Sequence, residues 1–154
     1  MTVKGIISED FINYKKVSMT IMFPYCKGFK CGNNYCQNSS LVNEKNIEIS
    51  VTDLVSKYVN NPITEAIVMQ GLEPFDSWDD VLTFIKELRK NTIDEVVIYT
   101  GYDKNEIFEQ VRELSKYPNI IIKFGRYIPN EIAHYDSILG VKLASNNQYA
   151  EKIS

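Results

Sequence analysis

Short apolar runs of strand length alternate with helical segments along this chain of 154 residues. The strand-length runs lie at 17–23, 65–70, 95–100 and 120–124. Between them, apolar residues recur at steps of three and four, which indicates amphipathic helices. Alternation of this kind predicts a mostly parallel sheet with right-handed crossover helices. We expect one α/β domain over 1–154, an open partial (βα) barrel, because about four or five such units are too few to close an eight-stranded barrel.

Helix boundaries are marked by capping residues. Asp76 or Ser77 is expected to cap a helix with its side chain, and Asp103 with Glu106 has the spacing of a capping box. Toward the end of the chain the pattern weakens. A further short strand is indicated only near 141–144.

The three cysteines of the chain, Cys26, Cys31 and Cys36, lie close together. The N-terminal residues show no signal-peptide pattern, and a secreted chain more often carries an even number of cysteines. We therefore expect a reducing, cytoplasmic location and metal binding rather than disulfides. Three thiolates can hold a metal ion or an iron–sulfur cluster while leaving one metal position open for a substrate.

Two alternatives for the cysteines stay open. A structural zinc site would need a fourth ligand, and His134 is the one histidine in the sequence. Structural zinc usually uses closely paired cysteines, and His134 lies far downstream of the others, so the cluster is favoured. The second alternative is that the cysteines are unligated thiols.

Unusual loops follow each of the predicted strands. The cysteines follow the first strand, Gly71-Leu72-Glu73-Pro74 follows the second, Thr100-Gly101-Tyr102 the third, and Gly125-Arg126-Tyr127 the fourth. Carboxyl ends of neighbouring parallel strands meet at one edge of a sheet, where ligands bind in α/β proteins. The sequence therefore predicts that thiolates, a carboxylate and a hydroxyl gather on one rim.

Charge and hydropathy exclude two classes of partner. The formal net charge is −3 and lysines are scattered, so no basic stripe indicates nucleic acid. No apolar run reaches the roughly 20 residues of a membrane span. We expect neither a nucleic-acid nor a membrane partner.

Several motifs together resemble those of small radical S-adenosylmethionine (SAM) activating enzymes, in particular the anaerobic ribonucleotide reductase activating family. They follow one another in the family's order over most of the chain: Tyr35-Cys36-Gln37-Asn38, Gly71-Leu72-Glu73-Pro74, Val97–Tyr102, Gly125–Ile128 and Ser145–Gln148. Two features depart from the family. The cysteine pattern is Cys-x4-Cys-x4-Cys instead of Cys-x3-Cys-x2-Cys, and Leu72 replaces the second glycine of the Gly-Gly-Glu-Pro motif.

The resemblance implies a cofactor set and roles for particular residues. Cys26, Cys31 and Cys36 would hold three irons of a [4Fe–4S] cluster, and the amino and carboxylate groups of SAM would chelate the fourth iron. Residues of the Gly71-Leu72-Glu73 loop would contact the methionine amino group through backbone oxygens or the carboxylate. Tyr35 would lie near the adenine and Thr100 near the ribose.

The resemblance also implies a reaction and a partner. An electron from a donor such as flavodoxin or ferredoxin would split SAM into methionine and a 5′-deoxyadenosyl radical. That radical would abstract hydrogen from a glycine of a large glycyl-radical enzyme, with anaerobic ribonucleotide reductase the expected partner. Two alternatives are a radical SAM enzyme acting on another peptide or small molecule, and a non-catalytic iron–sulfur or zinc protein.

Overall fold

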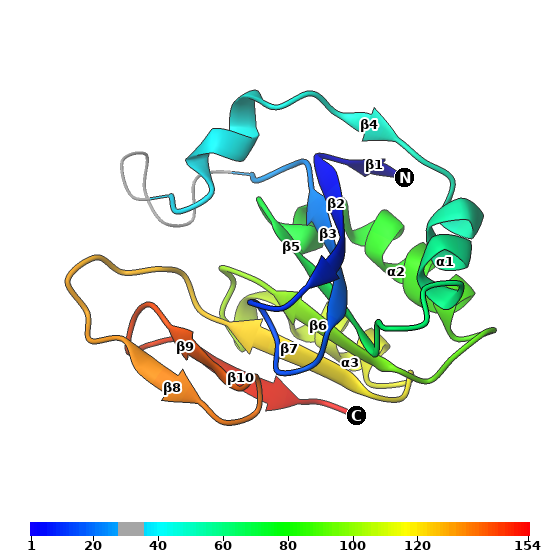
Figure 1. Ribbon diagram of the computed structural model, residues 1–154. Coiled ribbons are helices and arrows are strands. Elements are labelled where there is room, and N and C mark those ends of the chain that lie inside the picture. Colours follow the sequence, from blue (N-terminus) through cyan, green and yellow to red (C-terminus); the bar gives the residue numbers. More distant parts are fainter. Residues whose placement is uncertain (28–35) are drawn as a thin grey trace.

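A computed structural model describes residues 1–27 and 36–154 of the chain (Figure 1). Within these residues the centre of the fold is a mixed sheet of six strands. In spatial order the strands are β10 (Tyr149–Lys152), β7 (Ile120–Phe124), β6 (Glu95–Tyr99), β5 (Ala66–Gly71), β3 (Ser18–Phe23) and β2 (Gly5–Asp10). The inner strands β3, β5, β6 and β7 pair in parallel, whereas β2 and β10 add antiparallel edges.

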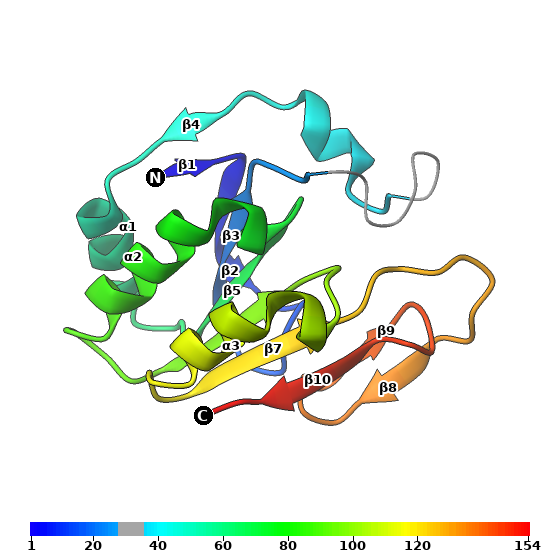
Figure 2. The same cartoon turned by 180° about the vertical axis from the view of Figure 1, so that it is seen from behind.

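Three α-helices lie on one face of this sheet (Figure 2). They are α1 (Val51–Val59), α2 (Trp78–Leu88) and α3 (Phe108–Leu114). Apolar side chains such as Ile67, Phe84 and Leu114 are fully buried between the helices and the strands. Burial of a side chain of this size contributes about 1.5–3 kcal/mol. The helices therefore fix the position of the strand ends that carry the loops.

The opposite face of the sheet is covered along only part of its length. Tyr14, from the turn between β2 and β3, packs there with Leu139 and Leu143 from the segment around β8 (His134–Asp136) and β9 (Val141–Leu143). A backbone hydrogen bond joins the turn after β2 to the segment around β8 and β9: Lys15 N donates to Leu139 O at 2.9 Å. The covering stops short of the carboxyl ends of the parallel strands, where the pocket described below opens.

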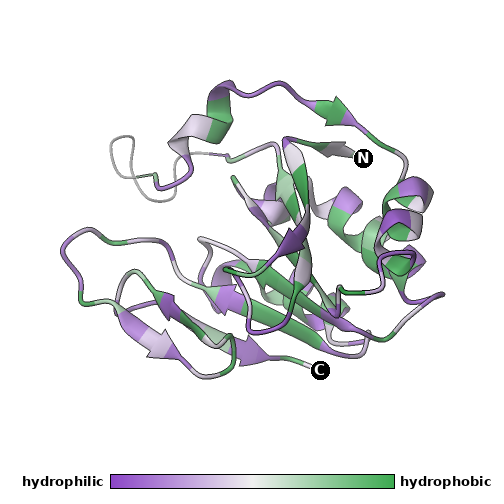
Figure 3. Ribbon diagram, in the orientation of Figure 1, coloured by the Kyte–Doolittle hydropathy of each residue, from purple (hydrophilic) through white to green (hydrophobic). Residues whose placement is uncertain are grey.

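Short elements complete the described fold. The two-residue strands β1 (Thr2–Val3) and β4 (Ile47–Glu48) pair with one another. Three 3₁₀ segments precede or connect larger elements: η1 (Ser39–Asn43), η2 (Pro74–Ser77) and η3 (Lys104–Ile107). Hydrophobic residues concentrate on the central strands and the inner helix faces (Figure 3). No helix in the described part of the chain is long and apolar enough to cross a membrane.

The predicted strands at 17–23, 65–70, 95–100, 120–124 and 141–144 are confirmed within one or two residues. The sequence did not reveal the antiparallel edge strands β2 and β10. The sheet is open at both edges, since β2 and β10 each pair on one side only. Its identity as a partial barrel of the radical SAM type stays a prediction.

The predicted position of the α2 N-cap is confirmed at Ser77, but the expected capping hydrogen bond from its side chain is wrong. Ser77 occupies the N-cap position but its side chain makes no capping hydrogen bond, and its hydroxyl is buried without a partner among the described residues. Asp76 instead accepts hydrogen bonds from Tyr102 and from the backbone of Lys27. Glu73 supplies the cap, one turn earlier, because its carboxylate accepts from Phe75 N at the start of η2. The helix therefore begins with a 3₁₀ turn.

The predicted capping-box contact of Glu106 is confirmed. Glu106 Oε2 accepts from Asp103 N at 2.8 Å, and Glu106 N donates to Asp103 O at 2.9 Å. These two bonds satisfy backbone groups at the start of η3, which leads directly into α3.

Candidate functional site

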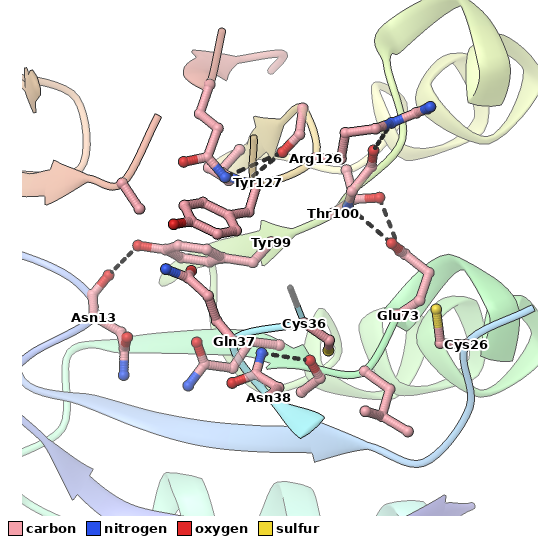
Figure 4. Close-up of a pocket in the computed structure, with 18 of the residues that line it drawn as sticks. Asn13, Cys26, Cys36, Gln37, Asn38, Glu73, Tyr99, Thr100, Arg126 and Tyr127 are labelled. Atoms are coloured by element: carbon pink, nitrogen blue, oxygen red, sulfur yellow. Dashed lines mark hydrogen bonds between the residues drawn. The ribbon is translucent and has the colours of Figure 1, made fainter. Parts of the chain in front are cut away.

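A pocket of about 780 Å³ opens at the carboxyl ends of the four parallel strands (Figure 4). Its size lies within the usual range of small-molecule and cofactor sites. Loops that follow β3, β5, β6 and β7 all contribute to its wall, as predicted for the carboxyl edge of a parallel sheet. Residues 141–144 and Asn13 line the side that faces the covered part of the sheet.

Cys26 and Cys36 both line this pocket and both are half-buried. Cys26 follows β3, whereas Cys36 precedes η1. No disulfide joins them. The predicted ligand Cys31 lies in the segment 28–35, outside the described residues, and so does Tyr35. Among the residues that are described, no group of three or more His, Cys, Asp or Glu side chains could hold a metal ion.

Hydrogen bonds tie the described part of the cysteine-bearing segment to the loop after β5. Asn38 Nδ2 donates to Gly71 O at 2.9 Å, and Glu73 N donates to Tyr25 O at 2.8 Å. Asn38 and Tyr25 thereby hold the two described ends of the cysteine segment against the same short loop. This arrangement explains how Cys36, well separated from β3 in sequence, returns to the pocket that Cys26 lines.

Gly71 allows the close contact between this loop and β3. Its φ is +107°, and a Cβ at this position would lie 2.6 Å from Phe23 N. Any other residue would be strained and would clash with the neighbouring strand. Leu72 is not among the described non-glycine residues with positive φ, which are Asn119 and Asn130. Replacement of the motif glycine by Leu72 therefore carries no backbone strain.

Glu73 belongs to this loop and is buried, with 1% of its surface exposed. Its Oε1 accepts from Thr100 Oγ1 at 2.8 Å and from Phe75 N at 3.1 Å. Its Oε2 accepts from Gly101 N at 2.8 Å. Burial raises the pKa of the Glu73 carboxyl from 4.5 to about 7, against the opposing effect of these three hydrogen bonds. The carboxylate thus joins the loops that follow β5 and β6.

Thr100 lies beside Glu73 and is itself buried. Its hydroxyl donates to Glu73 and accepts from Tyr102 N at 3.0 Å. The structure therefore brings the predicted site residues Gly71, Leu72, Glu73 and Thr100 to one pocket with two of the three cysteines. It does not test the roles that the resemblance implies for them.

Sequence reasoning did not single out several described pocket residues, among them Tyr99, Lys123 and Asn13. Tyr99, at the end of β6, donates from its hydroxyl to Asn13 O at 2.6 Å, and Lys123 donates from Nζ to Gly125 O at 2.7 Å. Lys123 is 6% exposed, although it interrupts an otherwise apolar strand. That interruption is a signal that sequence reasoning could have used. Asn13 has no such signal, since it depends on how the turn before β3 folds over the sheet.

His134 is not among the described residues that line the pocket that Cys26 and Cys36 share. It begins β8. Its Nδ1 is buried without a hydrogen-bond partner in the described part of the chain. The described positions therefore give no support to His134 as the fourth ligand of a zinc site.

Comparison with known proteins identifies the family. Residues 17–149 match the model of the 4Fe-4S single cluster domain, so the chain belongs to this family of iron–sulfur proteins. No curated protein and no solved structure matches the chain. The match covers all four parallel strands and all three cysteines.

The described donors fit a [4Fe–4S] cluster. Thiolates are the ligands that such clusters use, and Cys26 and Cys36 line the same pocket. The described pocket residues include no histidine that would complete a zinc site with them. The family match and the thiolate donors therefore both indicate that the chain binds a cluster.

Proposed function

We propose that the chain is a radical SAM enzyme that generates a glycyl radical on a partner enzyme, with anaerobic ribonucleotide reductase as the partner. One observation supports this most: Cys26 and Cys36 share a pocket with the Gly71–Glu73 loop at the carboxyl edge of a parallel sheet. A cluster held there would lie beside the backbone polar groups of this loop. A small ligand could then bind the cluster and the loop at the same time. The family match indicates a [4Fe–4S] cluster, whereas the reaction is part of this proposal.

Each residue of the site has a role in the proposal. Cys26, Cys31 and Cys36 hold three irons and leave one for the amino and carboxylate groups of SAM. The loop of Gly71, Leu72 and Glu73 faces the methionine amino group. Thr100 lies toward the ribose and Tyr35 toward the adenine. When bound, the cluster and SAM supply reductive cleavage of the sulfonium and hydrogen abstraction from glycine, whereas the chain binds, orients and excludes water.

The mouth of the pocket supports a protein as the substrate. Ile12 is 80% exposed, Tyr25 48% and Val42 44%, and all three line the pocket. Exposed apolar side chains around a functional pocket are typical of a surface that a partner covers. A large glycyl-radical enzyme would cover this mouth, and flavodoxin or ferredoxin would donate the electron. Such chemistry belongs in the reducing cytoplasm.

The test is cleavage of SAM by the reconstituted protein. The chain is loaded anaerobically with iron and sulfide, reduced with dithionite and incubated with SAM. We expect 5′-deoxyadenosine and methionine in equal amounts, and none from Cys36→Ala treated in the same way. A reconstituted cluster that never yields 5′-deoxyadenosine would refute the proposal and leave an electron carrier as the function.

The partner is tested separately. Mixing the reduced protein and SAM with anaerobic ribonucleotide reductase should give the doublet EPR signal of a glycyl radical. SAM cleavage without this signal, in the presence of a competent reductase, would favour another peptide or a small molecule as substrate.

A further inference from the structure

Both oxygens of the Glu73 carboxylate accept hydrogen bonds from the protein itself. One accepts from Thr100 Oγ1 and Phe75 N and the other from Gly101 N, at 2.8–3.1 Å. Only 1% of the residue is exposed, although Glu73 is among the residues that line the pocket. Figure 4 shows the carboxylate pointing toward Thr100. To reach a ligand, it would have to leave backbone N–H groups unpaired.

A second contact joins the same two loops. Tyr102 Oη donates to Asp76 Oδ1 at 2.7 Å, and Asp76 also accepts from Lys27 N in the cysteine segment. Beyond them, Gly101 O accepts from Arg126 Nε at 3.4 Å. Glu73 thus stands at the centre of hydrogen bonds that connect the loops after β3, β5, β6 and β7.

We propose that Glu73 is a positioning residue whose carboxylate fixes the loop after β5 against the loop after β6 and does not itself contact the ligand. This inference rests on the proposed function for the identity of the ligand. The carboxylate shapes the wall of the pocket, and other groups of the same pocket contact the ligand.

The hydrogen-bond geometry fits a carboxylate, which can accept on both oxygens. Three donors point at two oxygens, and two of these donors are backbone N–H groups, Phe75 N and Gly101 N, on opposite oxygens. A glutamine amide carries one oxygen and one NH₂ group. In either orientation of the amide, one backbone N–H would face another donor. Glu73→Gln therefore breaks the connection at nearly constant volume.

The first test measures SAM binding by the reconstituted, folded protein in Glu73→Gln, in Tyr102→Phe and in the double variant. We expect Glu73→Gln to weaken binding about tenfold. If both residues act by connecting the same two loops, the double variant should lose less affinity than the product of the two single losses. Losses that multiply would mean that Glu73 acts independently of this connection and would overturn the inference. Because affinity is measured on folded protein, a simple loss of stability would not produce the expected result.

Tyr102→Phe is the second variant, in case Glu73→Gln does not fold. It removes a second connection between the two loops, the hydrogen bond to Asp76, without changing Glu73, and Tyr102 is not among the described residues that line the pocket. We expect a smaller loss of SAM affinity, of about threefold. An affinity unchanged by Tyr102→Phe would contradict the view that fixing these loops controls binding.

The second test needs no ligand. Hydrogen exchange at the Gly101 amide or at the Phe75 amide should accelerate about tenfold or more in Glu73→Gln, because one of these two amides loses its acceptor. The Val96 amide, which donates to Asn119 O at 3.0 Å at the other end of β6, serves as the internal control and should not change. Unchanged exchange at both Gly101 and Phe75 would overturn the inference. If the wild-type protein did not bind SAM, the proposed function would fail, and the exchange result would still decide the role of Glu73.

Discussion

Two regions that meet at the pocket are held in different ways. The loop after β5 is buried: Glu73, Pro74 and Phe75 all lie inside, and hydrogen bonds connect them to β3 and to the loop after β6. The segment from Cys36 to β4 is different. Its 3₁₀ turn η1 contains no buried residue, and most of the segment is exposed.

The difference shows which part of the site is formed by packing. The 71–77 loop takes its conformation from the sheet below it. The segment after Cys36 gains little from apolar burial, so bonds to particular atoms must place it, such as the one from Asn38 to Gly71. Ligation of a cluster adds further bonds of this kind, and metal binding of this sort contributes directly to folding. We therefore expect the two regions to respond differently to substitution.

The largest effect is expected at the cysteines. Cys36→Ala should retain about a tenth or less of the wild-type iron after anaerobic reconstitution, because an iron loses its thiolate and even changes around metal ligands cost 10–100-fold. Cys26→Ala and Cys31→Ala should behave in the same way. Iron and labile sulfide analysis with visible absorption measures the loss. Ser39→Ala, at an exposed neighbouring position, is the matched control, and full iron in Cys36→Ala would show that the ligand set is wrong.

A glycine substitution tests the packed region. Gly71→Ala should lower the free energy of unfolding by about 4 kcal/mol, because the backbone strain at φ +107° adds to a clash with Phe23. Urea unfolding measures the change. Gly5→Ala is the control, since its new Cβ would meet only the flexible end of Met22. Equal stability of the two variants would contradict the claim that the 71–77 loop is held by close contact with β3.

The buried carboxylate gives a pH dependence of smaller size. The folded pKa of Glu73 is raised to about 7 from 4.5, mainly by burial, so the folded protein keeps a proton that the unfolded chain releases. The contribution of this retained proton to the free energy of unfolding is complete below pH 4.5 and is lost as the pH rises through about 7. The unfolding free energy of wild type, relative to Glu73→Gln, should fall by up to about 3 kcal/mol over this range.

A control with the opposite sign is available at the other end of β6. Burial alone would raise the pKa of Glu95, but hydrogen bonds from Lys16 and Tyr14 lower it overall. The contribution of Glu95 is therefore present above its unfolded pKa and lost as the pH falls. Glu95→Gln, compared with wild type by urea unfolding across pH, should show this reverse trend. A Glu73 contribution that grows with pH would contradict the burial argument.

The smallest effect is expected at the exposed segment. Asn38→Ala removes one partly buried hydrogen bond to Gly71 O and should cost about 1 kcal/mol of stability without the cluster. Thermal unfolding of the apo protein measures it, and Asn43→Ala, exposed in η1, is the control. A loss of stability in Asn38→Ala as large as that in Gly71→Ala would mean that close packing holds the segment after Cys36 as strongly as it holds the 71–77 loop.

Much of the fold is visible in the sequence because its central strands are local apolar runs. Ile120–Phe124 and Ala66–Gly71 are buried almost throughout, so their composition alone marks them as strands. The edge strand β10 was missed because Tyr149–Lys152 is short and mixed in polarity. Its pairing with β7 depends on tertiary contacts, which a local pattern does not record.

The site was predictable where topology alone decides it. Gly71, Glu73 and Thr100 follow parallel strands and therefore had to meet at one edge. Their hydrogen-bond partners could not be predicted, because the contact between the Glu73 carboxylate and Gly101 N depends on the depth of burial and on side-chain direction. Asn13 reaches the pocket only because its turn packs on the segment around Leu139. No sequence pattern links those two segments.

The central claim is that three cysteines hold a [4Fe–4S] cluster with one iron open to SAM. EPR of the anaerobically reconstituted and reduced protein, recorded with and without SAM, tests it most directly. We predict the signal of a reduced [4Fe–4S] cluster whose g-values shift when SAM is added, with no shift on adding 5′-deoxyadenosine alone, which lacks the chelating amino and carboxylate groups. A protein that takes up zinc but no cluster, or a cluster signal that SAM leaves unchanged, would contradict the account.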